Sequence, residues 1–172
     1  MFVAGHFTGI VLFFVGWVFI LNGLHALGRV GNKEAGWFNL VISLLMFLWI
    51  IRALVTNYLE DGTIWFVAGV TMFALTYLGL AGSYLLELDG RGLGWYCLWV
   101  AVVAPYIGYQ NFVAGDVRFG IIWLVWAVAW FCFWLILGLG KSKVMSKLKY
   151  FMIPVGVLTA WVPGFMLMND MW

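Results

Sequence analysis

The stretch 119–139 of the chain reads FGIIWLVWAVAWFCFWLILGL and contains no charged residue. A hydrocarbon core about 30 Å thick is crossed by roughly 20 apolar residues in a helix. The stretch is therefore long enough to span a bilayer. Because lipid offers no hydrogen-bond partner to a backbone group, a single spanning segment satisfies its backbone only as a helix. We predict a transmembrane helix here.

Five further stretches of the same kind fill most of the remaining sequence. They run over approximately Gly5–Leu27, Gly36–Thr56, Thr63–Leu86, Gly94–Phe112 and Tyr150–Asn169. Hydrophobic residues make up 66% of the 172 residues and charged residues only 9%. Too little sequence remains for a soluble domain. We therefore predict an all-α membrane protein with one domain, residues 1–172, and six transmembrane helices. The first stretch lacks a positive n-region and an A-x-A-like site, so we expect a span rather than a signal peptide.

The positively charged residues are distributed unevenly among the connections. The first, third and fifth connections hold seven of them: Arg29, Lys33, Arg91, Lys141, Lys143, Lys147 and Lys149. The second and fourth hold two, Arg52 and Arg118. Because Lys and Arg gather on the cytoplasmic side of membrane proteins, both termini are expected outside the cytoplasmic (inner) membrane. The basic run Lys141–Lys149 is either a topology anchor or a contact for anionic lipid. The net charge of +2 gives no indication of nucleic-acid binding.

The short connections and the small residues bear on how the helices pack. Short connections predict antiparallel hairpins formed by spans one and two, three and four, and five and six. Gly16, Gly23 and Gly79 are expected to let neighbouring helices approach closely. Pro163 removes a backbone donor and is expected to kink the last helix. The two cysteines, Cys97 and Cys132, lie within spans and are expected to behave as small hydrophobic residues.

Ionisable side chains are missing from the middle of every predicted span. Such groups are costly inside a membrane and mark catalytic or ion-coupled sites there. The two histidines, His6 and His25, lie at opposite ends of the first span, with no carboxylate at a metal-ligand spacing. We therefore predict no catalytic residue, no metal, no cofactor and no enzymatic activity.

Aromatic residues make up 20% of the sequence and are most ordered in the fifth span. They recur there at helical spacing, on one face, at Phe119, Trp123, Trp126, Trp130 and Trp134. Tryptophan normally prefers the membrane interface, so indoles in mid-span need an explanation. The stripe either packs between helices or against lipid, or forms the wall of a narrow slot for a small, flat, neutral molecule. Two roles are likewise open for the neutral polar residues at depth: they bond a neighbouring helix, or they line such a slot. These residues are Asn22, Thr76, Tyr77 and Thr159.

Short motifs spread over nearly the whole chain carry a resemblance to a known family. They are Val15-Gly16, Asn22-Gly23, Phe38-Asn39, Leu75-Thr76-Tyr77-Leu78, Glu87-Leu88-Asp89-Gly90, Gly94-Trp95-Tyr96-Cys97-Leu98, Trp123-x-x-Trp126-x-x-x-Trp130 and Leu158-Thr159-Ala160-Trp161-Val162-Pro163. In this order and spacing they resemble the AmiS/UreI family of amide and urea channels.

The resemblance implies six helices arranged as three hairpins around a pore in each protomer. It also implies a homohexamer with membrane lipid in its central hole, and passive movement of urea or a short aliphatic amide. The pore-lining positions it implies are Leu12, Val15, Phe19, Leu75, Gly79, Trp123, Trp126, Ala129 and Trp130. Asn22, Tyr77 and Thr159 are the candidate polar contacts of that pore.

Departures from the acid-gated urea channels favour the amide branch of the family. Those channels carry a histidine-rich outer loop, whereas the loops expected outside here, Asn57–Gly62 and Val113–Arg118, contain no histidine. Val155 stands where they carry a glutamate, and the small Gly79 and Ala129 are expected to widen the inner constriction. We predict a passive inner-membrane channel for short amides and urea that supplies a cytoplasmic amidase or urease. The alternatives are an ion-coupled amide transporter and a structural membrane protein without a lumen.

Overall fold

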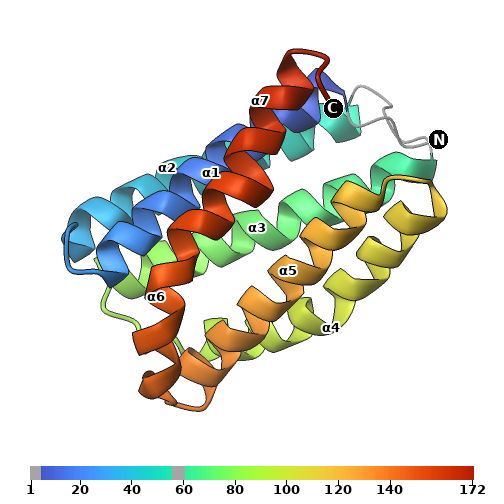
Figure 1. Cartoon of the computed structure of the whole chain (residues 1–172). Helices are drawn as coiled ribbons and strands as arrows, with labels where there is room; N and C mark the ends of the chain where they lie inside the picture. The colour runs from blue at the N-terminus through green and yellow to red at the C-terminus, as the bar shows by residue number, and fades with distance from the viewer. Residues whose placement is uncertain (1–4, 56–60) are drawn as a thin grey trace.

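The computed structural model describes residues 5–55 and 61–172, and its regular elements are all helical (Figure 1). In chain order they are α1 (His6–Ala26), α2 (Asn32–Val55), α3 (Asp61–Leu85), α4 (Arg91–Val113), α5 (Val117–Phe133), η1 (Trp134–Gly138), α6 (Ser142–Gly156), η2 (Val157–Trp161) and α7 (Val162–Met168). The elements η1 and η2 are π-helical turns. The last three elements follow one another without a break.

These elements form six helices that are long and apolar enough to cross a membrane, which confirms the predicted all-α class and number of spans. The last span begins at Ser142 rather than near Tyr150. The difference arises because the basic run Lys141–Lys149, which we assigned to a connection, forms the first turns of α6. Lysine is a good helix former, so hydropathy marks where a span enters the apolar region and not where its helix begins.

Both chain termini lie at the same end of the bundle, as an even number of spans requires (Figure 1). We call this the terminal end. The connections that precede α2, α4 and α6 lie at the opposite end, and they hold or adjoin the seven lysines and arginines counted above. We call it the basic end. Of the two connections at the terminal end, residues 57–60 of the expected loop Asn57–Gly62 lie outside the described residues.

Three closely packed antiparallel pairs are present, but their partners are shifted by one helix from the predicted pairing. The tight pairs are α2 with α3, α4 with α5, and α1 with the last span. The predicted pairs α1–α2, α3–α4 and α5–α6 share much smaller contacts. A short connection allows two helices to run antiparallel but does not decide which neighbour each one packs against. The residues along their faces make that choice.

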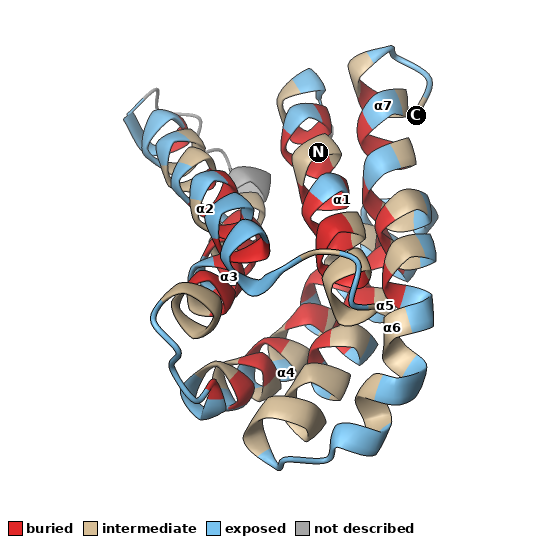
Figure 2. Cartoon of the chain, turned by 90° about the vertical axis from the view of Figure 1, so that its left-hand side faces the viewer, coloured by how far each residue is buried: buried red, intermediate tan, exposed pale blue. Residues whose placement is uncertain are grey.

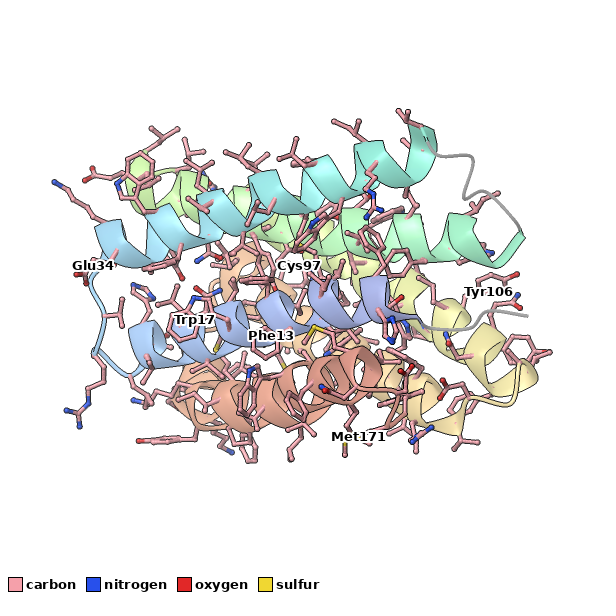
Figure 3. The ribbon with its side chains drawn as sticks, turned by 90° about the horizontal axis from the view of Figure 1, so that it is seen from above. Phe13, Trp17, Glu34, Cys97, Tyr106 and Met171 are labelled. Carbon is pink, nitrogen blue, oxygen red and sulfur yellow. The ribbon has the colours of Figure 1, made fainter. Side chains whose placement is uncertain are left out.

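Glycines on α1 and on α7 explain why α1 packs against the last span rather than against α2. A Cβ atom added at Gly16 would lie 2.5 Å from the backbone nitrogen of Trp161. One added at Gly164 would lie 2.5 Å from the backbone nitrogen of Phe13. Real side chains do not fit at such distances, so only glycine permits this approach of the two backbones. Figure 3 shows Phe13 beside the last helix, and its ring centre lies 5.9 Å from that of Trp161.

The last span changes its helical type between its two prolines. Pro154 lies within α6 and Pro163 lies in the first turn of α7, with the π-helical η2 between them. Proline has no N–H to give to the helix, so the regular hydrogen-bond pattern is interrupted on both sides of η2. Instead of a simple kink at Pro163, the structure has a widened turn, a feature frequent at functional sites. Thr159 lies in this turn, and its hydroxyl donates a 2.5 Å hydrogen bond to the carbonyl of Val155.

Buried residues gather on the inward faces of the helices, and exposed apolar residues cover the outer faces (Figure 2). Such an apolar exterior suits contact with lipid. Cys97 is 1% exposed and lies within the bundle (Figure 3), whereas Cys132 is half-buried, and neither is in a disulfide.

Candidate functional site

A wide cavity of about 530 Å³ opens at the terminal end of the bundle. The first half of α1, the first half of α3, the end of α4 and the start of α5 form its wall. Its lining residues from α1 are Thr8, Val11, Leu12 and Val15, and those from α5 are Phe119, Trp123 and Trp126. Gln110 and Asn111, from α4, add carboxamides to a mainly apolar wall. The cavity is large enough to admit small organic molecules with their hydration water.

A narrow cavity of about 20 Å³ lies further toward the basic end. It is lined by Phe19, Asn22, Phe73, Thr76, Tyr77, Leu80, Trp126, Ala129, Trp130, Phe133 and Met152. A space of this size holds about one water molecule. This second cavity lies where the four elements α1, α3, α5 and α6 converge.

Phe73 and Trp126 line both cavities and form the partition between them. Their rings meet edge to face, with centres 4.8 Å apart. The ring of Phe73 also lies 4.7 Å from that of Trp130. Aromatic pairs in these arrangements are stabilised beyond the area they bury. The partition is thus a packed aromatic cluster, with Phe73 facing the tryptophan stripe across the path.

Two indole N–H groups of the stripe, those of Trp126 and Trp130, are bonded to neighbouring helices, whereas the N–H of Trp134 is buried without a partner among the described residues. Trp126 Nε1 donates to Thr159 Oγ1 of η2 at 2.8 Å, and Trp130 Nε1 donates to Thr76 Oγ1 of α3 at 3.1 Å. Each threonine in turn donates to the carbonyl four residues earlier in its own helix. The tryptophans therefore present ring faces and edges to the cavities, while their polar atoms hold the walls together.

Other polar side chains on the narrow cavity keep unused hydrogen-bonding capacity. Tyr77 donates its hydroxyl to the carbonyl of Val15 over a long 3.5 Å. Asn22 exchanges hydrogen bonds with Asn39, which lies behind it on α2. The wall thus combines apolar rings with a few neutral polar atoms.

Most of the predicted pore positions lie on these cavities. Leu12, Val15 and Trp123 line the wide cavity; Trp126 lines both; and Phe19, Ala129 and Trp130 line the narrow one. Of the predicted polar contacts, Asn22 and Tyr77 line the narrow cavity. Thr159 is not among the lining residues but is bonded to Trp126.

The structure does not bring Leu75 or Gly79 to either cavity. Leu75 is 39% exposed on the outside of α3, and a Cβ added at Gly79 would meet the side chain of Leu93 on α4 at 2.8 Å. Phe73, which our sequence analysis missed, holds the inward position instead. Two residues correspond to more than half a turn of an α-helix, so a shift from 73 to 75 moves the side chain to the other face. The spacing of Phe73 with Thr76 and Tyr77 was the signal that could have found it.

Within the described ranges, neither cavity is lined by a histidine or a charged residue. His6 Nε2 lies 2.9 Å from Asp170 Oδ1 at the terminal end, with both side chains exposed. His25 Nε2 lies 2.8 Å from Asn32 Oδ1 at the basic end. Residues 5–55 and 61–172 also contain no cluster of side chains suited to hold a metal ion.

Comparison with known proteins identifies the family. Residues 7–171 match the model of the AmiS/UreI family of transporters. The chain belongs to the AmiS/UreI family. It is 35% identical to an amidate substrates transporter protein of Mycolicibacterium smegmatis, over 95% of this chain and 78% of that protein. It is 27% identical to an acid-activated urea channel of Helicobacter pylori, over 95% and 98% of the two chains. The cryo-EM structure of the Helicobacter pylori urea channel in a closed state superposes with a TM-score of 0.86 at 25% identity, covering 96% of this chain and 99% of that one.

These similarities confirm the resemblance drawn from the sequence motifs. The higher identity to the amidate transporter than to the urea channel agrees with the predicted place in the amide branch. The AmiS/UreI family consists of transporters, so the prediction that the chain is not an enzyme is also confirmed.

Proposed function

We propose that this AmiS/UreI protein is a passive channel for urea and short aliphatic amides. The observation that carries the proposal is the alignment of the two cavities along one tryptophan stripe, lined throughout by apolar and neutral polar residues. The solute enters the wide cavity, passes the partition of Phe73 and Trp126, and leaves through the narrow cavity. Leu12, Val15, Phe19, Trp123, Trp126, Ala129 and Trp130 line this path, whereas Leu75 and Gly79 have no part in it.

The chemistry of the wall favours small, flat, neutral solutes. An ion would lose its hydration water in the narrow cavity and gain no opposite charge there, at a cost of several kcal/mol. A planar carboxamide slides between aromatic rings and exchanges its lost water for the few polar atoms on the wall. Because no Asp, Glu, Lys, Arg or His among the described residues lines either cavity, the path has no evident group for coupling transport to a proton or a sodium ion, which disfavours the transporter alternative.

The proposed path is narrow beside Phe73, Trp126 and Trp130. Urea is several times larger than water, and the narrow cavity of about 20 Å³ does not admit it. Conduction therefore requires the rings of the partition to change rotamer. Phe73 holds no side-chain hydrogen bond, so it is freer to move than Trp126 and Trp130, whose N–H groups are bonded.

The surroundings of the channel follow from its charges and its apolar exterior. We place the basic end in the cytoplasm and the terminal end outside the inner membrane, by the distribution of Lys and Arg. Protomers associate as a homohexamer through part of the apolar outer surface, and lipid contacts the rest and fills the central hole. The conducted amide or urea supplies a cytoplasmic amidase or urease.

The test is stopped-flow uptake by proteoliposomes that contain the purified oligomer. Urea, acetamide and glycerol are measured side by side, with empty liposomes as the control. We expect urea and acetamide to enter faster than in empty liposomes and glycerol to be excluded. Equal uptake with and without the protein would mean that the bundle has no lumen and serves a structural role.

A further inference from the structure

Two buried carboxamides form a reciprocal pair beside the narrow cavity. Asn22 Nδ2 of α1 donates to Asn39 Oδ1 of α2 at 3.1 Å, and Asn39 Nδ2 donates back to Asn22 Oδ1 at 2.8 Å. Asn22 is 4% exposed and Asn39 is fully buried. Buried polar groups are costly in an apolar bundle unless they are bonded. In this pair, each carboxamide supplies a hydrogen-bond donor and an acceptor to the other, which offsets the cost of burying both.

A third hydrogen bond fixes which atom of each carboxamide is the nitrogen. Asn39 Nδ2 also donates to the carbonyl of Ala35, one turn earlier in α2, at 2.8 Å. A carbonyl accepts only from a donor, so Asn39 cannot be flipped, and its reciprocal bonds then fix the orientation of Asn22. Both N–H groups of Asn39 are used by these bonds.

Asn22 keeps hydrogen-bonding capacity that its partner has lost. A carboxamide has two N–H donors and an oxygen with two lone pairs, and the pair with Asn39 uses one donor and one lone pair of Asn22. The residue lines the narrow cavity. Thr76, by contrast, both donates to Met72 and accepts from Trp130. Asn22 thus keeps one N–H donor and one oxygen lone pair, on opposite flanks of its carboxamide, free to bond at the constriction.

We propose that Asn22 is a specificity-determining residue of the channel and that Asn39 is its positioning residue. The free N–H of Asn22 donates to the carbonyl oxygen of a passing solute, and the free lone pair of Asn22 Oδ1, on the other flank, accepts from its NH₂ group as the solute moves on. This inference rests on the proposed function and names the group that recognises the amide. A site built to hydrogen-bond a solute discriminates strongly against molecules that lack the matching groups.

The experiment compares urea, acetamide and water permeability of oligomers in proteoliposomes. The key variant is the double replacement Asn22→Leu with Asn39→Leu. Replacing both partners of a hydrogen bond by apolar groups of similar shape leaves no unsatisfied atom, so the fold is retained. We expect the ratio of urea to water permeability, and of acetamide to water, to fall about tenfold or more. Asn39→Leu alone should lower both ratios by a smaller factor, because Asn22 remains but is no longer held.

Ser43→Ala supplies the matched control. Ser43 lies one turn beyond Asn39 on α2, is fully buried, donates to the carbonyl of Ala74 at 2.8 Å and lines neither cavity. Its replacement also breaks a buried hydrogen bond of α2, and both permeability ratios should stay at the wild-type value. A folded double leucine variant with wild-type ratios overturns the inference, and so does an equal fall in Ser43→Ala. A wild-type protein that conducts neither urea nor acetamide overturns the proposed function instead.

Discussion

Trp130 and Thr76, which both line the narrow cavity, are joined by a hydrogen bond of 3.1 Å from the indole Nε1 to the threonine Oγ1. Both residues are buried, and they come from α5 and α3. The bond ties the tryptophan stripe of α5 to α3 and restrains the ring of Trp130 beside the cavity.

Trp130→Ala should change which solutes pass. Without this ring the narrow cavity widens, so glycerol should enter together with urea, while sodium and protons stay excluded because a desolvated charge still costs several kcal/mol. Trp134→Ala is the control, since Trp134 contacts Trp95 and Phe131 and lines neither cavity. Uptake normalised to folded oligomer gives the measurement. If the stripe only packs helices, Trp130→Ala should cost about 3–5 kcal/mol of stability and leave selectivity unchanged.

Thr76→Val should destabilise the wall without removing any ring. The replacement keeps the shape of the side chain but leaves the indole N–H of Trp130 buried and unbonded, at a cost of about 1–3 kcal/mol. Thr76→Ser keeps the hydroxyl and should behave almost as wild type. The loss of oligomer on heating, followed by size-exclusion chromatography, measures the difference. Equal melting of the valine and serine variants would show that the bond contributes nothing.

Phe73→Ala should raise the urea permeability. Phe73 lies with Trp126 between the two cavities of the proposed path, and its ring makes no hydrogen bond that the fold needs. Leu75→Ala is the matched control on the same helix, because Leu75 points away from the path. If Leu75→Ala raised the urea permeability as much as Phe73→Ala does, the path would not run along the face of α3 that carries Phe73.

Permeability should be nearly constant between about pH 5 and 8, the range in which histidine ordinarily changes its charge. No histidine or carboxylate among the described residues lines either cavity, so nothing on the path titrates there. His6 is the histidine nearest the terminal-end entrance, where it contacts Asp170. Urea uptake measured across this range, for wild type and His6→Ala, makes the comparison. A several-fold activation at pH 5 that survives His6→Ala would contradict the account.

The sequence predicted the individual helices of this fold better than it predicted which helices pack against each other. Charge-free apolar runs such as Phe119–Leu139 are sufficient to predict each span, because the bilayer imposes both length and helical conformation. The pairing of α1 with the last span depends on backbone contacts such as that of Gly16 with Trp161. Those contacts join residues far apart in sequence, and a glycine alone does not reveal its partner.

The residues that line the two cavities were recognisable in the sequence on α5 but not on α3. The stripe from Trp123 to Trp130 follows helical spacing, and these tryptophans line the cavities. On α3, Leu75 lies two residues from Phe73, which on a helix is nearly the opposite face, and Gly79 faces Leu93 of α4. The hydrogen bonds of Thr76 and Thr159 to the stripe depend on where α3 and η2 lie around α5. Those positions are known only once the helices are assembled into the bundle.

The most direct test of the path is to block it from inside the wide cavity. Leu12→Cys places a thiol on its wall, and Ile10→Cys places one at similar depth on the outer surface of α1, where Ile10 is 37% exposed. Each variant is treated with a charged methanethiosulfonate from the terminal end, and labelling is verified by mass. We expect labelled Leu12→Cys to lose urea uptake by about tenfold or more, because the bulky adduct occupies the path of the solute, and labelled Ile10→Cys to keep it. Undiminished uptake through fully labelled Leu12→Cys would contradict the account.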